Sequence, residues 1–290
     1  MGSTQFEHLV KKHPCFNGEA HFNYGRIHLP VSPTCNIQCK FCKRSLNKTE
    51  NRPGVASKIL TPAASLELVD KALQLCPEIT VVGIAGPGDT LATPNALETF
   101  ELIDRKHPEL IKCISTNGLM LYEYAERIAT AGIKTISVTV NAVDAEILQD
   151  ICTGIFYNGD YLEGSEGAVR LIDAQMAGIK KISSLGVTVK VNTVLIPGLN
   201  YDHIEEIAKV VSEAGASIMN IIPLIPQNEM IGFRAPDCNE LNNARKAAEK
   251  YLQVFRHCQQ CRADACGIPG KGKDFAELLY EQPVMTFSHG

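Results

Sequence analysis

The sequence contains no apolar run long enough to cross a membrane. Its most apolar stretch, residues 218–226, is interrupted by Asn220, Pro223 and Pro226, whereas a membrane-spanning helix needs about 20 apolar residues in succession. The chain of 290 residues also lacks a block of lysine and arginine, and its formal net charge is −4. We therefore expect neither a membrane nor a nucleic-acid partner, and small-molecule chemistry fits better.

The N-terminus lacks the apolar core of a secretory signal, and Phe6 stands where a myristoylation signal has serine or threonine. We expect a cytoplasmic protein. Cytoplasmic thiols stay reduced, so the eleven cysteines are not expected to form disulfides. Metal binding is the better explanation for several of them.

Three cysteines, Cys35, Cys39 and Cys42, lie within eight positions in a C-x3-C-x2-C pattern. Three thiolates bind three irons of a [4Fe-4S] cluster and leave the fourth iron open, which is useful only if another molecule binds there. A structural zinc site is the alternative, but zinc takes four protein ligands and no fourth Cys or His lies near Cys42. The spacing favours a catalytic cluster.

With Phe41 before its last cysteine, this pattern resembles the signature of radical S-adenosylmethionine (SAM) enzymes. The resemblance implies that Cys35, Cys39 and Cys42 are the catalytic cluster ligands. It also implies that SAM chelates the open iron through its amino and carboxylate groups. The reduced cluster then splits the SAM sulfonium to give a 5′-deoxyadenosyl radical.

Strand-like and helix-like segments alternate after a first predicted strand at residues 27–31. Thr61-Pro62 and Thr93-Pro94 each resemble an N-cap followed by proline at the first helical position. Apolar residues recur at helical spacing at 121–128 and 204–211, and a last helix is expected to carry Leu241, Ala244, Ala248, Tyr251 and Phe255. Further strands are expected at 79–85, 111–115, 134–140, 187–195 and 218–224.

These segments predict an α/β fold, a partial (β/α)6 TIM-like barrel of the radical SAM type. Residues 27–235 would form the barrel, residues 1–26 an N-terminal extension with extra cluster ligands, and residues 236–290 a C-terminal helix and cysteine-bearing tail. The active site of such a barrel lies at the carboxyl ends of its strands.

Two of the predicted strands alternate polar and apolar residues, at 135–141 and 187–192. A closed eight-stranded barrel is packed with branched apolar side chains, so a polar inner face indicates a wider, incomplete barrel around a polar ligand. The alternative is an edge sheet with one face in water.

The residues that follow the strands are candidates for SAM binding. Glycines in Ala85-Gly86-Pro87-Gly88-Asp89 would let backbone groups approach a ligand and leave main-chain donors free, although such a segment can equally be a simple turn. Cys113, Ser115 and Asn117 share one face of their strand, and Cys113 could instead be a small core residue. Asn141 and Asn192 would bind ribose or the SAM carboxylate. The expected SAM-binding residues are Gly86, Gly88, Asp89, Ser115, Asn117, Asn141 and Asn192.

Both ends of the chain carry further metal-ligand types. His13, Cys15 and His21 lie shortly before the cysteine motif, and the tail contains Cys258-Gln-Gln-Cys261 with Cys266 five residues on. A C-x-x-C pair in this compartment indicates metal, with a redox pair as the alternative. The remaining thiols match no motif and are interpreted as ordinary ones: Cys76, Cys152 and Cys238.

Nearly the whole chain resembles the NifB family of nitrogenase cofactor biosynthesis proteins. The motifs that carry the resemblance are His13-Pro-Cys15, Glu19-Ala-His21, the Cys35–Cys42 core, Arg52-Pro-Gly-Val55, Ala85–Asp89, Ser115-Thr-Asn-Gly118 and Cys258–Ala265. Longer family members add a NifX-like domain, so we expect a short form without it.

The family implies two further [4Fe-4S] clusters, K1 and K2, as substrates or precursors. Position by position, Cys15, Cys113, Cys258 and Cys261 are their expected ligands, with His13, His21 and Cys266 as weaker candidates. Many relatives have another cysteine after the motif, but residues 43–51 contain none. Cys266, Glu50 or a histidine would have to replace it.

The implied activity is that of a radical SAM enzyme that fuses K1 and K2, inserts a carbide derived from the SAM methyl group and adds a ninth sulfur. The product would be the [8Fe-9S-C] precursor of the nitrogenase cofactor. Expected partners are iron–sulfur cluster donors, an electron donor and a maturation scaffold that receives the product. The alternatives are a radical SAM enzyme with auxiliary clusters acting on an organic or peptide substrate, and a non-enzymatic iron–sulfur carrier.

Overall fold

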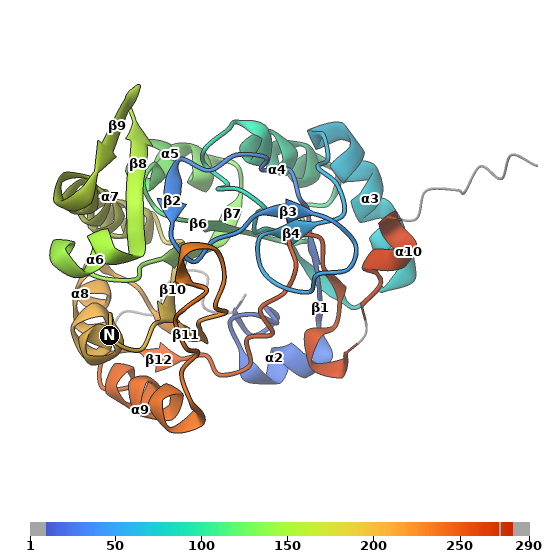
Figure 1. Ribbon diagram of the computed structural model, residues 1–290. Helices are drawn as coiled ribbons and strands as arrows, with labels where there is room; N and C mark the ends of the chain where they lie inside the picture. Colours follow the sequence, from blue (N-terminus) through green and yellow to red (C-terminus); the bar gives the residue numbers. More distant parts are fainter. Residues whose placement is uncertain (1–9, 273, 281–290) are drawn as a thin grey trace, which may run out of the picture.

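The computed structural model describes residues 10–272 and 274–280. Its centre is a curved sheet, in which the described residues form eight strands in the order β12-β11-β10-β7-β6-β5-β1-β13 (Figure 1). The bounds of these strands are Gly25–His28 (β1), Ile79–Ile84 (β5), Ile111–Thr116 (β6), Ile133–Thr139 (β7), Thr188–Leu195 (β10), Ile218–Pro223 (β11), Gln253–Val254 (β12) and Cys266–Gly267 (β13).

The six longer strands are parallel to one another, which confirms the predicted α/β fold and the positions of its strands. Two short strands from the C-terminal tail extend this sheet: β12 is parallel to β11, and β13 is antiparallel to β1. Consecutive parallel strands require a crossover connection, which the helices provide.

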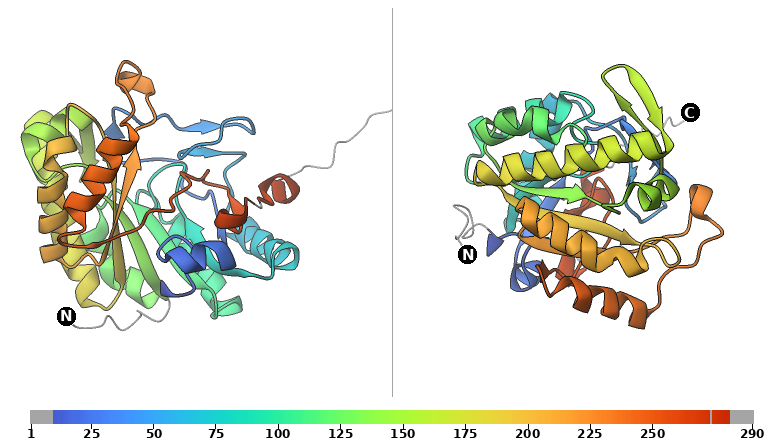
Figure 2. Two further views of the ribbon diagram at one scale, coloured as in Figure 1. Left: turned by 90° about the horizontal axis from the view of Figure 1, so that it is seen from below. Right: turned by 90° about the vertical axis from the view of Figure 1, so that its left-hand side faces the viewer.

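Helices lie around the outside of the curved sheet (Figures 1 and 2). Their apolar faces pack on the valine and isoleucine side chains of its outer face, such as Ile136, Val138 and Val191, to form the largest core. The helix bounds are Gly18–Asn23 (α2), Pro62–Leu75 (α3), Asn95–Lys106 (α4), Leu121–Thr130 (α5), Ala145–Ile151 (α6), Gly164–Ser184 (α7), Ile204–Ala214 (α8), Cys238–Ala248 (α9) and Ala276–Tyr280 (α10). Short 3₁₀ helices lie at Tyr201–His203, Asn228–Met230 and Pro269–Lys271.

Two predicted helix boundaries differ from the structure. Thr61 caps α3 by accepting a hydrogen bond from Ala64 N, as expected. Thr93 does not cap α4, because Pro94 occupies the N-cap position and the helix begins at Asn95. The last predicted helix was too long: α9 ends at Ala248, and Phe255 follows a strand whose backbone pairs with β11.

Some strands of the structure were not predicted from the sequence pattern, and they lie between residues 141 and 187 and around the cysteine motif. Strands β8 (Cys152–Tyr157) and β9 (Asp160–Glu163) form a hairpin at the upper left of Figure 1, and β2 (Ile37–Cys39) joins it as a third strand. A two-stranded sheet of β3 (Ser45–Leu46) and β4 (Val55–Ala56) follows the cysteine motif.

The inner side of the sheet is closed at one end by a small apolar cluster. Phe16 from the N-terminal segment and Phe255 from the tail pack there against Val81, Ile111 and Ile218, near the beginnings of their strands. The two extensions therefore form the floor of the barrel. No helix in the described part of the chain is both long and apolar enough to span a bilayer.

Candidate active site

The cysteine motif forms a loop at the carboxyl-terminal side of the sheet. Cys39 ends β2, and Cys42 N–H donates to Cys39 O at 3.0 Å in a tight turn. Cys35, Cys39 and Cys42 are all partly buried. Cys35 and Cys42 line an outer cavity of about 680 Å³ together with Lys43, Arg44 and Asn228.

Cys39 has a second thiol opposite it. Cys152 is its partner across the β2–β8 pair. A hydrogen bond with Cys152, followed by burial, raises the pKa of Cys39 well above its usual value. Cys152 matches no sequence motif, and it lies far from Cys39 in the chain, so only the strand pairing shows that the two thiols are opposite each other.

The glycine segment after β5 anchors the cysteine loop. Gly88 N–H donates to Ser32 O at 2.7 Å, and Asp89 N–H donates to Thr34 O at 2.8 Å. A side chain at Gly88 would place its Cβ 1.9 Å from Thr34 O, so only glycine fits here. The expected free main-chain group is therefore not the N–H of Gly88, which is already bonded within the protein. Gly86 has a φ of +119°, which favours glycine for conformational reasons.

The buried carboxylate of Asp89 organises the end of β6. It accepts hydrogen bonds from Asn117 N at 2.6 Å, Leu91 N at 2.9 Å and Thr116 Oγ1 at 3.0 Å. Burial raises the pKa of Asp89, and these hydrogen bonds oppose the rise. Asp89 thus fixes the backbone that carries Asn117.

Asn117 connects β6 to the cysteine loop. Its Nδ2 donates to Asn36 Oδ1 at 2.7 Å and approaches Cys35 Sγ at 3.8 Å. Asn117 therefore lies beside the cysteine motif, and its contact with SAM stays a prediction.

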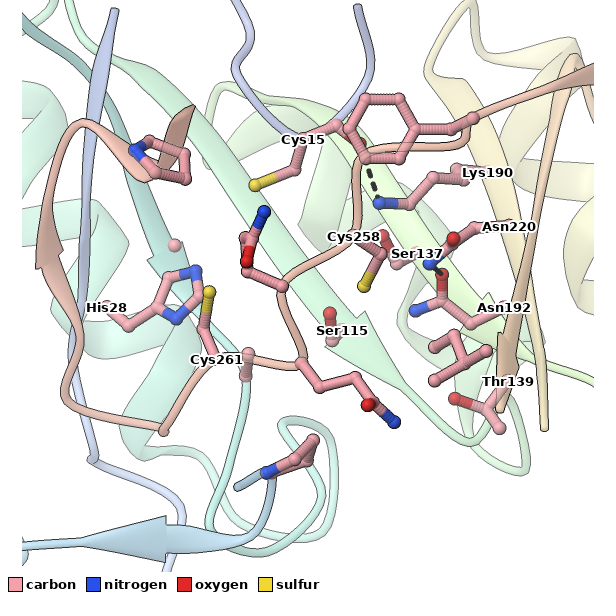
Figure 3. A pocket seen from close by; sticks show the side chains of 18 of the residues that line it. Cys15, His28, Ser115, Ser137, Thr139, Lys190, Asn192, Asn220, Cys258 and Cys261 are labelled. Atoms are coloured by element: carbon pink, nitrogen blue, oxygen red, sulfur yellow. Dashed lines mark hydrogen bonds between the residues drawn. The ribbon is translucent and has the colours of Figure 1, made fainter. Parts of the chain in front are cut away.

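The inner face of the sheet encloses a lumen, a cavity of about 310 Å³ (Figure 3). Ser115, Ser137, Thr139, Lys190 and Asn192 all line it, which confirms the predicted polar face and rules out an edge sheet in water. Asn141 is buried outside the lumen, where its Oδ1 accepts from Val194 N at 2.9 Å.

The cysteine loop separates the lumen from the outer cavity. Phe41 lines the lumen, while its neighbour Cys42 lines the outer cavity. Likewise, Gln227 lines the lumen and its neighbour Asn228 lines the outer cavity. Asn228 Nδ2 donates to Cys42 O at 3.3 Å. Anything bound at the loop would lie next to the contents of the lumen.

Four cysteines from distant parts of the sequence meet in the lumen: Cys15, Cys113, Cys258 and Cys261. Figure 3 shows Cys15, Cys258 and Cys261 around one space. Cys113 is nearly buried on β6, whereas Cys258 is exposed on an irregular segment of the tail. The structure therefore brings all four predicted residues together.

Positive charge lies close to these thiols. Arg26 Nη2 donates to Cys261 Sγ at 3.2 Å, and Arg26 Nη1 donates to Gly267 O at 2.8 Å. Burial raises the pKa of Cys15 to about 12, and Lys190 opposes that rise. Burial and then Asp89 raise the pKa of Cys35 to about 12. Cys15 and Cys35 are therefore protonated without metal, so metal binding to either of them must displace a proton.

Four histidines line the lumen, and three of them, described next, differ in the ring nitrogen that is free to bind a ligand. His21 Nδ1 lies 3.0 Å from Pro14 O and His28 Nδ1 lies 3.1 Å from Arg262 O. A carbonyl only accepts, so these Nδ1 atoms carry the proton and each Nε2 has a free lone pair. His13 is the reverse, because its Nδ1 accepts from Cys15 N at 3.1 Å.

His21 and His28 are therefore suited to bind metal as they stand. In this arrangement His13 carries its proton on Nε2, which is also buried without a hydrogen-bond partner. The Nε2 of His21 is buried without a hydrogen-bond partner, a cost that a bound metal would remove. His28 was not among the predicted ligands. Its position at the end of β1, directly before the cysteine loop, is the sequence signal that could have identified it.

An arginine fixes the tail to the loop that follows the cysteine motif. Arg262 donates to Asn47 O at 2.8 Å and Glu50 O at 2.5 Å, and it pairs with the fully buried Asp264 at 2.8 Å. Asp264 in turn accepts from Ser57 N at 2.5 Å. The position of Cys261 is set by its neighbour Arg262.

Two candidate replacements for the missing family cysteine do not reach the lumen. Cys266 is fully buried in the main core on β13, opposite Ile27, so the prediction that it could be a ligand is wrong. Glu50 is turned toward Arg52, Ser45 and Asn47 of its own loop. The local spacing of Cys258, Cys261 and Cys266 did not show that a strand begins at the last of them.

The donor set fits iron–sulfur clusters. The lumen offers thiols and imidazoles, the ligand types that hold such clusters. Among the described residues, no three His, Cys, Asp or Glu side chains converge on a site for a single metal ion.

Comparison with known proteins identifies the class. A model of the radical SAM superfamily matches residues 29–211. Solved structures agree in fold: SuiB from Streptococcus suis aligns over 81% of this chain and 50% of its own with a TM-score of 0.60 and 13% identity. Methylornithine synthase (PylB) aligns over 84% and 67% with a TM-score of 0.55 and 15% identity. The chain is a radical SAM protein, for which a [4Fe-4S] cluster and SAM are the cofactors.

The relatives found by sequence identify the family within this superfamily. A protein of Methanocaldococcus infernus named FeMo cofactor biosynthesis protein NifB is 51% identical over 96% of this chain and 93% of its own length. One of the same name from Chlorobaculum tepidum is 42% identical over 90% of this chain and 63% of its own. The chain belongs to the NifB family.

Proposed function

We propose that this protein acts in FeMo cofactor biosynthesis by fusing two [4Fe-4S] clusters, K1 and K2, in its lumen. A carbide from the SAM methyl group and a ninth sulfur would complete the [8Fe-9S-C] precursor. The observation that supports this most is the placement of four cysteines from three separate regions of the chain beside the cysteine loop. An organic substrate would not need so many thiols in its cavity.

The cysteine loop holds the catalytic cluster in this proposal. Cys35, Cys39 and Cys42 would provide its three thiolates. When bound, that cluster and SAM supply a methyl group and a 5′-deoxyadenosyl radical that abstracts hydrogen. Asn117 and the Gly86–Asp89 segment hold the loop in place, through Asn36 and through the carbonyls of Ser32 and Thr34. Gly86, Ser115 and Asn192 remain candidates for direct contact with SAM.

The lumen residues hold the substrate clusters. Cys15, Cys113, Cys258 and Cys261 would provide thiolates, and His21 and His28 would each provide an Nε2 lone pair. We assign to these histidines the ligand position that the family cysteine leaves open. Phe16 and Phe255 close the floor, so the substrate is shielded from water on that side.

The function also needs partner proteins. Iron–sulfur cluster donors would supply the lumen, an electron donor would reduce the loop cluster, and a maturation scaffold would receive the product. The exposed, irregular tail around Cys258 gives the substrate clusters a route into and out of the lumen. We propose that the protein works in the cytoplasm, where thiols stay reduced.

The test uses SAM labelled in its methyl carbon. Reconstituted protein is incubated anaerobically with reductant and labelled SAM, and the metal clusters are extracted free of protein. We expect the label in the extracted cluster. The Cys238→Ala variant is the matched control, because this exposed cysteine on α9 lines neither cavity, and it should incorporate label like the wild type.

Label found only in methionine or an organic product would contradict the proposal and favour a radical SAM enzyme with an organic or peptide substrate. A protein that holds clusters but never cleaves SAM would be an iron–sulfur carrier. Both outcomes differ from the expected one in where the labelled carbon is found.

A further inference from the structure

Lys190 is a buried cation without a carboxylate partner. It lies on β10 with 5% of its surface exposed, and its side chain lines the lumen. Nζ donates to Cys15 O at 2.9 Å and lies 4.5 Å from the ring centre of Phe16 and 5.6 Å from that of Phe255. Within the described residues, no Asp or Glu forms an ion pair with it, although a buried charge is costly unless it is paired.

A second buried lysine on the same sheet has its charge paired with a carboxylate, as is usual for buried charges. Lys112 on β6 is 2% exposed and pairs with Asp104 at 2.5 Å. Its partner lies on the outer helix α4, away from the lumen. The fold can therefore supply a carboxylate to a buried lysine, and it does not do so at Lys190.

The lumen as a whole has no negative side chain of its own. Its described lining contains no Asp or Glu, whereas it does contain Lys190 and four cysteines. Arg26 does not line the lumen, but it is a second buried cation next to it, and its Nη2 donates to Sγ of the lumen residue Cys261. A cavity of this kind is complementary to an anion.

We propose that Lys190 is the charge anchor of the lumen, a binding residue that holds a net-negative, inorganic substrate and fixes Cys15 through its carbonyl. This inference rests on the proposed function. Thiolate-bound iron–sulfur clusters are anions, and each cysteine that loses its proton adds negative charge beside Nζ. The lumen is therefore built for the loaded state, and the cluster-free protein keeps an unpaired cation on its floor.

The Lys190→Met variant tests the proposal because two measurements should move in opposite directions. Methionine keeps the shape of the side chain and removes the charge. The cluster-free variant should have a Tm at least as high as the wild type, since a buried unpaired cation is lost. After anaerobic reconstitution, its iron content should fall from about 12 per chain toward about 4, with the spectrum of the loop cluster unchanged.

Two further variants complete the test. Lys190→Arg keeps the charge and should keep at least half of the lumen iron. Lys112→Met should lower the Tm, because Asp104 loses its partner, while its folded fraction keeps the wild-type iron content. In the wild type, added salt during reconstitution should reduce lumen loading, and in Lys190→Met this dependence should be weaker.

The proposal is overturned if Lys190→Met keeps wild-type lumen iron, or if it lowers the Tm as much as Lys112→Met does. A wild type that binds only about 4 irons would instead contradict the proposed function itself, and the anchor with it. The two failures are therefore distinguished by the wild-type iron content alone.

Discussion

The two groups of cysteines in this protein are built in opposite ways. Cys35, Cys39 and Cys42 come from one short loop, and the backbone around Ser32 and Thr34 fixes that loop to the sheet. The lumen cysteines come from the N-terminal segment, from β6 and from the tail, and they meet only when the chain has folded.

This difference fits a difference in role. A cofactor that stays bound suits ligands on a single fixed segment. A substrate that must enter and leave suits ligands on separate segments, of which at least one can move away. Cys113 lies on a central strand, while Cys258 lies on an exposed segment between β12 and β13. The tail is thus the part of the lumen best suited to open.

The largest expected effect comes from breaking the loop. Cys39→Ala should abolish reductive cleavage of SAM, because a cluster that loses one of three thiolates is not held stably. The measurement is the production of 5′-deoxyadenosine under reducing conditions, with iron content as a second readout.

The matched variant is Cys152→Ala, which removes the thiol opposite Cys39. It should keep the loop cluster and SAM cleavage, since three thiolates remain and the fourth iron stays open for SAM. If it lost the cluster as completely as Cys39→Ala, a fourth thiolate would be a ligand and the site would not be open.

The second largest effect is expected for a lumen cysteine, and it distinguishes the role of the lumen from that of the cysteine loop. Cys258→Ala should keep the loop cluster and SAM cleavage but abolish precursor formation, with a loss of about 4 of about 12 irons. The electron paramagnetic resonance spectrum of the reduced protein and the iron count measure these two properties. Unchanged precursor formation would remove Cys258 from the ligand set.

The smallest effect concerns the support of the loop. Asp89→Ala leaves three buried donors without their acceptor, so the free energy of unfolding should fall by about 2–4 kcal/mol. Because Asn117 would lose its position beside Cys35, SAM affinity should fall about tenfold. Chemical denaturation and SAM binding measure the two.

The partly exposed Asp70 provides the comparison for Asp89. It pairs with Lys106 and His107 on the surface, so Asp70→Ala should change stability by less than about 1 kcal/mol and leave SAM binding as it is. Equal effects of the two substitutions would show that Asp89 has no special connection to the site.

Features that depend on neighbouring residues could be predicted from the sequence. The C-x3-C-x2-C spacing, the alternation of β7 and β10 and the proline that begins α3 are local patterns, and the structure contains all three. That the lumen cysteines lie together could be predicted only from the resemblance to a family, because no local pattern connects Cys15 to Cys258.

Features that depend on distant pairing could not be predicted. The opposition of Cys39 and Cys152 requires the β2–β8 register, and the burial of Cys266 requires the β1–β13 pair. The choice among His13, His21 and His28 depends on which backbone group each Nδ1 meets. Helix α7 was missed although Ala168, Leu171 and Ile182 follow helical spacing along its buried face.

The most direct test of whether the loop cluster is the catalyst and the lumen clusters are the substrate follows the iron atoms of each. Protein that carries only its loop cluster, made with natural-abundance iron, is given [4Fe-4S] clusters made with ⁵⁷Fe, then reductant and SAM. We predict that the extracted carbide-containing product contains ⁵⁷Fe and that the iron of the loop cluster stays with the protein. Product built from loop-cluster iron, or ⁵⁷Fe that remains bound to the protein after SAM is consumed, would contradict this prediction.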